Sequence, residues 1–138
     1  MYLLDTNVVS ELRKPKPHGA VLAWINGVAE SDLFLCAITL AEIQAGIEIT
    51  RQQDKAKAQA IEHWLDQVAS AYNILPLDGE VLRVWAKMMH QQSDTRYEDG
   101  MIAACARVNK LTVVTRNISD FKSFDVALSN PFLHRSAD

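Results

Sequence analysis

Short segments that are apolar at almost every position alternate with longer segments of helical pattern. The short segments are predicted strands, at residues 2–5, 33–38, 73–77, 111–115 and, less regularly, 125–129. The longer segments have apolar residues spaced three and four apart, which predicts helices, over residues 20–28, 39–50, 55–72, 79–92 and 97–110. Strands without polar positions are buried on both faces. The alternation therefore predicts an α/β fold with a mostly parallel sheet flanked by helices.

We expect one domain over residues 1–138, because this length is typical of a single core. No linker or repeat divides the chain, and its strongest loops lie at residues 13–19 and 74–80. Cys36 and Cys105 both lie in apolar segments, which favours free buried thiols over a disulfide framework. We see no signal-peptide pattern and no apolar run of membrane-spanning length, so we expect a cytoplasmic protein.

Two acidic residues stand where burial is predicted. Asp5 ends the first strand, and parallel sheets bind their ligands at the carboxyl ends of their strands. Glu42 falls within an apolar stripe of its helix that is formed by Ile38, Ala45 and Ile49. A buried carboxylate without a partner costs several kcal/mol, so Glu42 needs a cation or hydrogen-bond donors.

A third acid repeats this anomaly in the helix at residues 97–110. Asp99 precedes Ile102, Ala103 and Ala106 by three, four and seven residues, so it shares their stripe. The surrounding residues are small and apolar, as expected of a helix packed closely against the sheet. Asp99 is therefore predicted to enter the interior from the first turn of its helix.

Each acid also has a simpler explanation when it is taken alone. Asp5 could cap a following helix, Asp99 could stabilise a helix dipole, and Glu42 could pair with an arginine. A single crevice that holds all three acids explains them together. Such a cluster offers only oxygen ligands, which suits Mg²⁺ or Mn²⁺ and does not suit zinc.

Five segments resemble the PIN-domain family, and more narrowly the VapC/FitB-type toxins of bacterial toxin–antitoxin modules. They are LLDTNVVSEL (3–12), AITLAEIQAGI (37–47), EDGMIAACA (98–106), LTVVTRNISDF (111–121) and NPF (130–132). The resemblance implies a parallel sheet of four to five strands and a Mg²⁺- or Mn²⁺-dependent ribonuclease, which hydrolyses RNA phosphodiesters with a metal-activated water. It also implies a homodimer and a cognate antitoxin that blocks the site.

The resemblance assigns the metal-binding and catalytic acids residue by residue. Asp5, Glu42 and Asp99 match the family's metal-binding acids in position. A fourth family acid often stands at the position of Asn117, which is an amide here. Asp120, three residues later, is the nearest acidic substitute and completes the expected catalytic and metal-binding set.

Other residues are expected to support this site or to bind its partners. Thr6 and Thr115 match supporting positions of the family, and Asn7 and Asn117 are added as neighbours. Arg13 and Arg116 are candidates to position RNA phosphates, although the net charge of −3 does not favour nucleic-acid binding. The antitoxin is expected to place an Arg or Lys against the acids.

Two other functions remain open at this point. The acids could form a non-catalytic pocket that binds a partner's arginine or a structural ion. Asp5 could instead be the nucleophile of a phosphoaspartyl transferase, although Asn7 stands where such motifs carry a second Asp.

Overall fold

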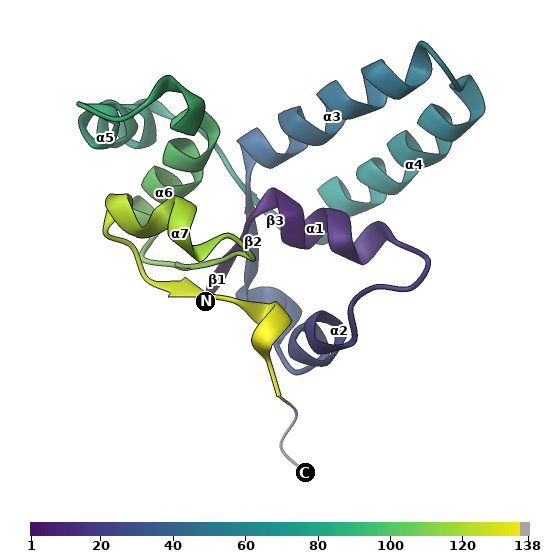
Figure 1. The fold of residues 1–138 in the computed structure, drawn as a ribbon, viewed down its shortest axis with the longest axis horizontal. Coiled ribbons are helices and arrows are strands. Elements are labelled where there is room, and N and C mark those ends of the chain that lie inside the picture. The colour runs from purple at the N-terminus through teal and green to yellow at the C-terminus, as the bar shows by residue number, and fades with distance from the viewer. Residues whose placement is uncertain (136–138) are drawn as a thin grey trace.

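A computed structural model describes residues 1–135 and shows one parallel sheet with helices on both faces (Figure 1). Its strands are β1 (Tyr2–Leu4), β2 (Leu33–Cys36), β3 (Asn73–Leu75), β4 (Thr112–Val114) and β5 (Leu128–Ser129). The spatial order is β3-β2-β1-β4-β5, and every neighbouring pair is parallel. The α/β prediction is therefore confirmed, with each strand shorter than predicted.

The first strand of the chain lies at the centre of the sheet. In β1, Leu3 is in register with Phe34 of β2 and with Val113 of β4. The backbone N–H of Asp5 donates to the carbonyl of Val114 at 2.9 Å, so the β1–β4 pairing extends one residue past β1. Since all strands are parallel, their carboxyl ends form one edge, and Asp5 lies in its middle.

Seven α-helices and four short 3₁₀ helices surround the sheet within residues 1–135. The α-helices are α1 (Thr6–Arg13), α2 (Gly19–Asn26), α3 (Ala37–Arg51), α4 (Lys55–Ala71), α5 (Gly79–Met89), α6 (Tyr97–Asn109) and α7 (Ile118–Phe121). The 3₁₀ helices are η1 (Glu30–Asp32), η2 (Asp94–Arg96), η3 (Lys122–Phe124) and η4 (Pro131–Leu133). In Figure 1, α5, α6 and α7 lie on one side of the sheet, and α1 to α4 lie on the other.

Alternate side chains of the strands build two separate cores. Leu3 packs with residues of α5, α6 and η3, whereas Leu4 packs with residues of α1, α2 and α4. This is the two-residue period of a strand buried on both faces. A third, smaller cluster packs α3 against α4, with Ile47 and Leu65 among its buried residues.

Gly100 allows α5 and α6 to pack closely. A Cβ atom at this position would lie 2.5 Å from the Met89 sulfur and 3.2 Å from the Trp85 ring. Trp85 is itself held, because its indole N–H donates to the Tyr97 carbonyl at 3.0 Å. Only glycine fits here without moving the side chains of α5.

The apolar stripe expected to bury Glu42 is wrong. Ile49 is 65% exposed and Ala45 is also exposed, whereas Thr39 and Ile47 form the buried face of α3. Glu42 is half-buried because neighbouring elements cover it, and not because it lies at the centre of an apolar face.

Two other expectations from the sequence can be checked. Cys36 and Cys105 are free and buried, as predicted. Within residues 1–135, no helix combines the length and apolar character that crossing a bilayer requires.

Candidate active site

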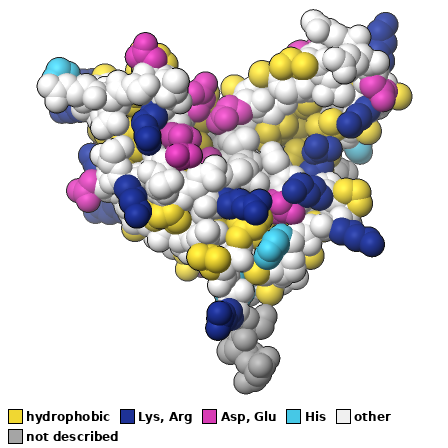
Figure 2. Space-filling model, viewed as in Figure 1, with side chains coloured by type: hydrophobic (Ala, Val, Ile, Leu, Met, Phe, Trp, Pro, Cys, Tyr) yellow, Lys and Arg dark blue, Asp and Glu magenta, His cyan; other side chains and the backbone are white. Residues whose placement is uncertain are grey.

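Four acidic residues from separate elements meet at the carboxyl edge of the sheet. Asp5 joins β1 to α1, Glu42 lies in α3, Asp99 lies in the first turn of α6, and Asp120 lies in α7. The negative charge of Asp5 raises the pKa of both Glu42 and Asp99, so the three carboxylates are near one another. In Figure 2, acidic side chains gather in the hollow between the α5–α6 flank and the α3–α4 flank.

Asp5 is the most buried of the four acids, with 6% of its surface exposed. Its Oδ1 accepts the Thr6 backbone N–H at 2.8 Å, and its Oδ2 accepts the Thr115 hydroxyl at 2.7 Å. Burial raises the pKa of Asp5, and the hydrogen bonds from Thr115 and Thr6 oppose this rise. The simpler explanation for Asp5 is also correct, because its carboxylate is the N-cap of α1.

Glu42 is linked to the sheet edge through two threonine hydroxyls. Its Oε1 accepts the Thr6 hydroxyl at 3.0 Å, and the Thr6 oxygen lies 3.0 Å from the Thr39 hydroxyl. A hydroxyl has one proton to donate, so Thr39 donates to Thr6 while Thr6 donates to Glu42. Burial raises the pKa of Glu42, and the charges of Asp5 and nearby acids raise it further. Within the described chain, Glu42 forms no ion pair with an arginine.

Asp99 has the most strongly shifted carboxyl group of the site. Its pKa rises to about 6, chiefly because of burial and then because of the charges of Asp5 and Asp120. The guanidinium of Arg96 lowers the pKa in part. A carboxylate in the first turn of a helix is normally favoured by the helix dipole. Burial and the neighbouring acids oppose that preference at Asp99.

Thr115 connects the two polar segments that end β1 and β4. Its hydroxyl donates to Asp5, accepts the Asn117 backbone N–H at 3.0 Å, and lies 3.5 Å from the Asn7 amide nitrogen. The Asn7 side-chain oxygen accepts the backbone N–H of Arg116 at 3.4 Å. The predicted supporting residues are thus in contact, and Thr115 is fully buried at their centre.

Asp120 lies with the acids, whereas Asn117 lies at the surface. The charge of Asp120 raises the pKa of both Asp5 and Asp99, and the Asp120 side chain is half-buried. Arg96 fixes this part of α7, because its Nη1 donates to the Asp120 carbonyl at 2.7 Å. Asn117 is exposed and precedes α7 without capping it through its side chain.

The four acids offer the type of ligand atom that a divalent cation prefers, but their carboxylates are not close enough together to share one ion. Within residues 1–135, no three His, Cys, Asp or Glu side chains are arranged closely enough to ligate an ion together. All the donors are carboxylate or hydroxyl oxygens, which suit Mg²⁺ or Mn²⁺. The raised pKa values of Asp5, Glu42 and Asp99 report mutual repulsion and desolvation, and a bound cation would relieve both.

Three residues near the acids were not among the predicted site residues. Thr39 and Arg96 stand three residues before Glu42 and Asp99, so they lie one helical turn away and could have been found by that spacing. Glu98 raises the pKa of both acids but is exposed. Nothing in its position distinguishes Glu98 from an ordinary surface charge.

The predicted phosphate-binding residue Arg13 and its neighbour Lys14 differ in their surroundings. Arg13 lines a cavity of about 300 Å³ that also borders Thr6, Glu42 and Trp64, so it lies along a groove that leads to the acids. Lys14, by contrast, pairs with the buried Glu11 at 2.9 Å and stabilises the end of α1.

A larger cavity of about 370 Å³ lies away from the acids. It is bordered by Leu12, Leu33 and Tyr72, toward the opposite edge of the sheet. None of the four acids lines it.

A family model, curated proteins and a solved structure all relate this chain to PIN-domain toxins. The PIN domain family matches residues 2–126. Toxin FitB of Neisseria gonorrhoeae is 36% identical, covering 96% of this chain and 99% of that protein. The VapC ribonuclease Y4jK of Sinorhizobium fredii is 34% identical, covering 96% of this chain and 98% of that protein. A crystal structure of FitAcB from Neisseria gonorrhoeae superposes with a TM-score of 0.85 at 34% identity, over 96% of this chain and 99% of that one.

Proposed function

Because the chain belongs to the PIN-domain family, and within it to the group of VapC and FitB toxins, we propose that it is a Mg²⁺- or Mn²⁺-dependent endoribonuclease. It would act in the cytoplasm as the toxin of a toxin–antitoxin module, with the chain working as one nuclease domain. The observation that carries the proposal is the meeting of Asp5, Glu42, Asp99 and Asp120 at one edge of the sheet.

The residues of the site would divide the work of phosphodiester hydrolysis. Asp5, Glu42 and Asp99 would hold the cation, and Asp120 would complete the ligand set. A divalent cation in this position supplies water activation near neutral pH and neutralises charge on the leaving oxygen. Thr115 holds one oxygen of Asp5 and leaves its other lone pairs free to bind.

The burial of Asp5 does not favour a phosphoaspartyl transferase. In-line attack on a phosphate needs an open approach to an Asp5 oxygen, whereas only 6% of this residue is exposed; a metal ion needs only a free lone pair. A transferase would form an acid-labile covalent phosphate on Asp5. A nuclease that uses activated water would leave the protein unmodified.

The substitution Asp99→Asn tests the nuclease directly. The purified protein should cleave single-stranded RNA in Mn²⁺ and lose this activity in chelator, because the acids act through the cation. Asp99→Asn should abolish cleavage and weaken Mn²⁺ binding in calorimetric titration while the circular dichroism spectrum stays unchanged. A folded Asp99→Asn protein with wild-type metal affinity would contradict the proposal. Metal binding without cleavage of any RNA would favour the non-catalytic pocket.

The acid cluster also suggests how an antitoxin would inhibit the protein. An Arg or Lys from the antitoxin would replace the cation at Asp5, Glu42 and Asp99, where a charged donor is favoured. The cavity beside Glu42 and Arg13 offers a route for the segment that carries it. Replacing this basic residue of the antitoxin by Ala should restore RNA cleavage in the mixture. A complex in which the antitoxin touches only the far side of the sheet would contradict this assignment.

We further propose that the active form is a homodimer. Several helices expose large apolar side chains, including Leu22, Ile49 and Leu82. Light scattering coupled to gel filtration should give twice the mass of the 15.4 kDa chain. A monomer that cleaves RNA at full rate would contradict this part of the proposal.

A further inference from the structure

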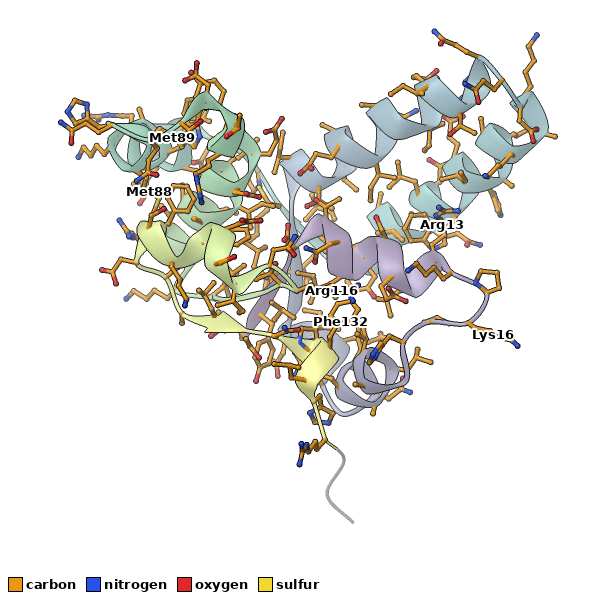
Figure 3. The ribbon with its side chains drawn as sticks, in the orientation of Figure 1. Arg13, Lys16, Met88, Met89, Arg116 and Phe132 are labelled. Atoms are coloured by element: carbon orange, nitrogen blue, oxygen red, sulfur yellow. The ribbon has the colours of Figure 1, made fainter. Side chains whose placement is uncertain are left out.

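The guanidinium of Arg116 is stacked on an aromatic ring at the rim of the acid site. Its central carbon lies 4.5 Å from the centroid of the Phe132 ring. Figure 3 shows Arg116 near the centre of the molecule, with Phe132 directly below it on η4. A cation over an aromatic face at this distance is attracted by the negative face of the ring.

The backbone of Arg116 is held from both sides. Its N–H donates to the Asn7 side chain at 3.4 Å, and its carbonyl accepts the Asn130 side chain at 3.4 Å. Thr115, which donates to Asp5, is the preceding residue, so the Cα of Arg116 lies about 3.8 Å from that of Thr115. Arg116 is thus anchored directly after the residue that hydrogen-bonds to Asp5.

Phe132 is held in place by contacts of its backbone and of its ring. Its backbone N–H donates to the Asn130 side chain at 2.9 Å, and the preceding Pro131 is buried. The His18 ring packs against its edge, with the ring centroids 5.2 Å apart. His18 is held in turn, because its backbone N–H donates to the buried Glu11 at 3.0 Å.

Within residues 1–135, Arg116 forms no ion pair, although four carboxylates gather at the same edge of the sheet. The Phe132 ring instead supplies the contact that holds this guanidinium. Among the same residues, the hydrogen bonds of Arg116 are made by its backbone, so the guanidinium N–H donors are available to a ligand.

We propose that Phe132 is a positioning residue, which holds the Arg116 guanidinium at the rim of the acid site so that it binds a phosphate of the RNA substrate. The proposal rests on the proposed nuclease function. Guanidinium groups bind phosphate oxygens through paired N–H donors, and a stacked guanidinium loses less freedom when it does so. The C-terminal NPF segment thereby acquires a role in substrate binding.

The test measures binding of a short fluorescent single-stranded RNA of mixed sequence, in chelator so that no cleavage occurs. Arg116→Gln should weaken binding and reduce the slope of log affinity against log salt by about 0.7, the value for one lost phosphate contact. Phe132→Leu should weaken binding about two- to five-fold, the fold-change expected from one exposed cation–π contact. Phe132→Tyr keeps the ring and should restore wild-type affinity.

A double variant tests whether Phe132 acts on RNA binding through Arg116 or only through a general loss of structure. The double variant Arg116→Gln, Phe132→Leu should bind no more weakly than Arg116→Gln alone. Arg116→Lys keeps the charge without the flat guanidinium, so it should resemble Phe132→Leu. Leu133→Ala is the matched control, because Leu133 follows Phe132 and is 75% exposed.

The outcomes also separate this proposal from the nuclease assignment. In Mn²⁺, Phe132→Leu should raise the KM for RNA and leave kcat unchanged. Additive losses in the double variant, or wild-type binding by Arg116→Gln, would overturn the proposal while RNA cleavage by the wild-type protein stands. A wild-type protein that neither binds nor cleaves RNA would overturn both.

Discussion

Replacing Asp99 by Asn should make the metal-free protein more stable, because this carboxylate is held in an unfavourable place. Burial and the charges of Asp5 and Asp120 raise its pKa from 3.8 to about 6. A difference of about two in pKa corresponds to about 3 kcal/mol of penalty for the ionised form. Asp99 is half-buried, and solvent screening reduces this to about 1 kcal/mol. For a chain of this length, we expect the melting temperature to rise by about 3–5 °C.

The sign of the pH dependence follows from the raised pKa of Asp99. Between pH 3.8 and about 6 the folded protein binds more protons at this site than the unfolded chain does, so its stability falls as pH rises. Below this window Asp99 is protonated in both states and costs nothing. The advantage of Asp99→Asn should therefore be absent below the window, grow through it, and stay constant above it.

Metal should reverse the order of stability. At about one hundred times its dissociation constant, a cation stabilises the protein that binds it by about 2.7 kcal/mol, which exceeds the gain from Asp99→Asn. Thermal unfolding followed by circular dichroism, in chelator and in Mn²⁺, measures both effects. Asp66→Asn on the exposed face of α4 is the control and should change stability by less than about 0.5 kcal/mol. An Asp99→Asn protein that is less stable than wild type in chelator above the window would refute the reasoning.

Four further substitutions probe the packing and the ligand set. Thr115→Val removes the 2.7 Å hydrogen bond that lowers the pKa of Asp5, so it should destabilise the fold by about 1–3 kcal/mol and move the acidic limb of the pH–rate profile to higher pH. An unmoved limb would contradict this. Asp120→Asn should strongly reduce cleavage and Asn117→Asp should preserve it; wild-type activity of Asp120→Asn would leave the site with three acids. Gly100→Ala should lower the melting temperature measured by calorimetry, because its Cβ would displace side chains of α5 at a cost of about 1–3 kcal/mol; an unchanged melting temperature would show that α5 yields freely.

The strands and most helices could be predicted because their pattern is local. Unbroken apolar segments predicted buried parallel strands, and the helical spacing predicted α4 within one residue of its bounds, with Leu65 and Val68 buried. Helix α1 was not predicted, because only its capping residue Asp5 suggested a helix start. The stripe of α3 was misjudged, because the later part of this helix packs against α4 through Ile47 and leaves Ile49 exposed to solvent.

The site was harder to predict than the fold, because its contacts join distant residues. Asp5, Glu42 and Asp99 could be selected as acids in apolar surroundings, but the hydrogen bond from Thr115 to Asp5 spans 110 residues. The role of Arg96 depends on how α7 docks against η2, which no local spacing specifies. Stacking of Arg116 on Phe132 likewise depends on where η4 returns to the sheet.

The central place of β1 also affects when this protein can become active during its synthesis. Strand β1 precedes β4 by more than 100 residues in the sequence, yet Val114 of β4 and the following Thr115 complete the surroundings of Asp5. A nascent or truncated chain that lacks β4 has an open edge beside β1 and cannot assemble the acids, since such long-range pairing waits for the later segment. We therefore expect a chain that ends before Thr115 to lack the proposed cation site. The proposed nuclease activity would then appear only once the segment that carries β4 has been made.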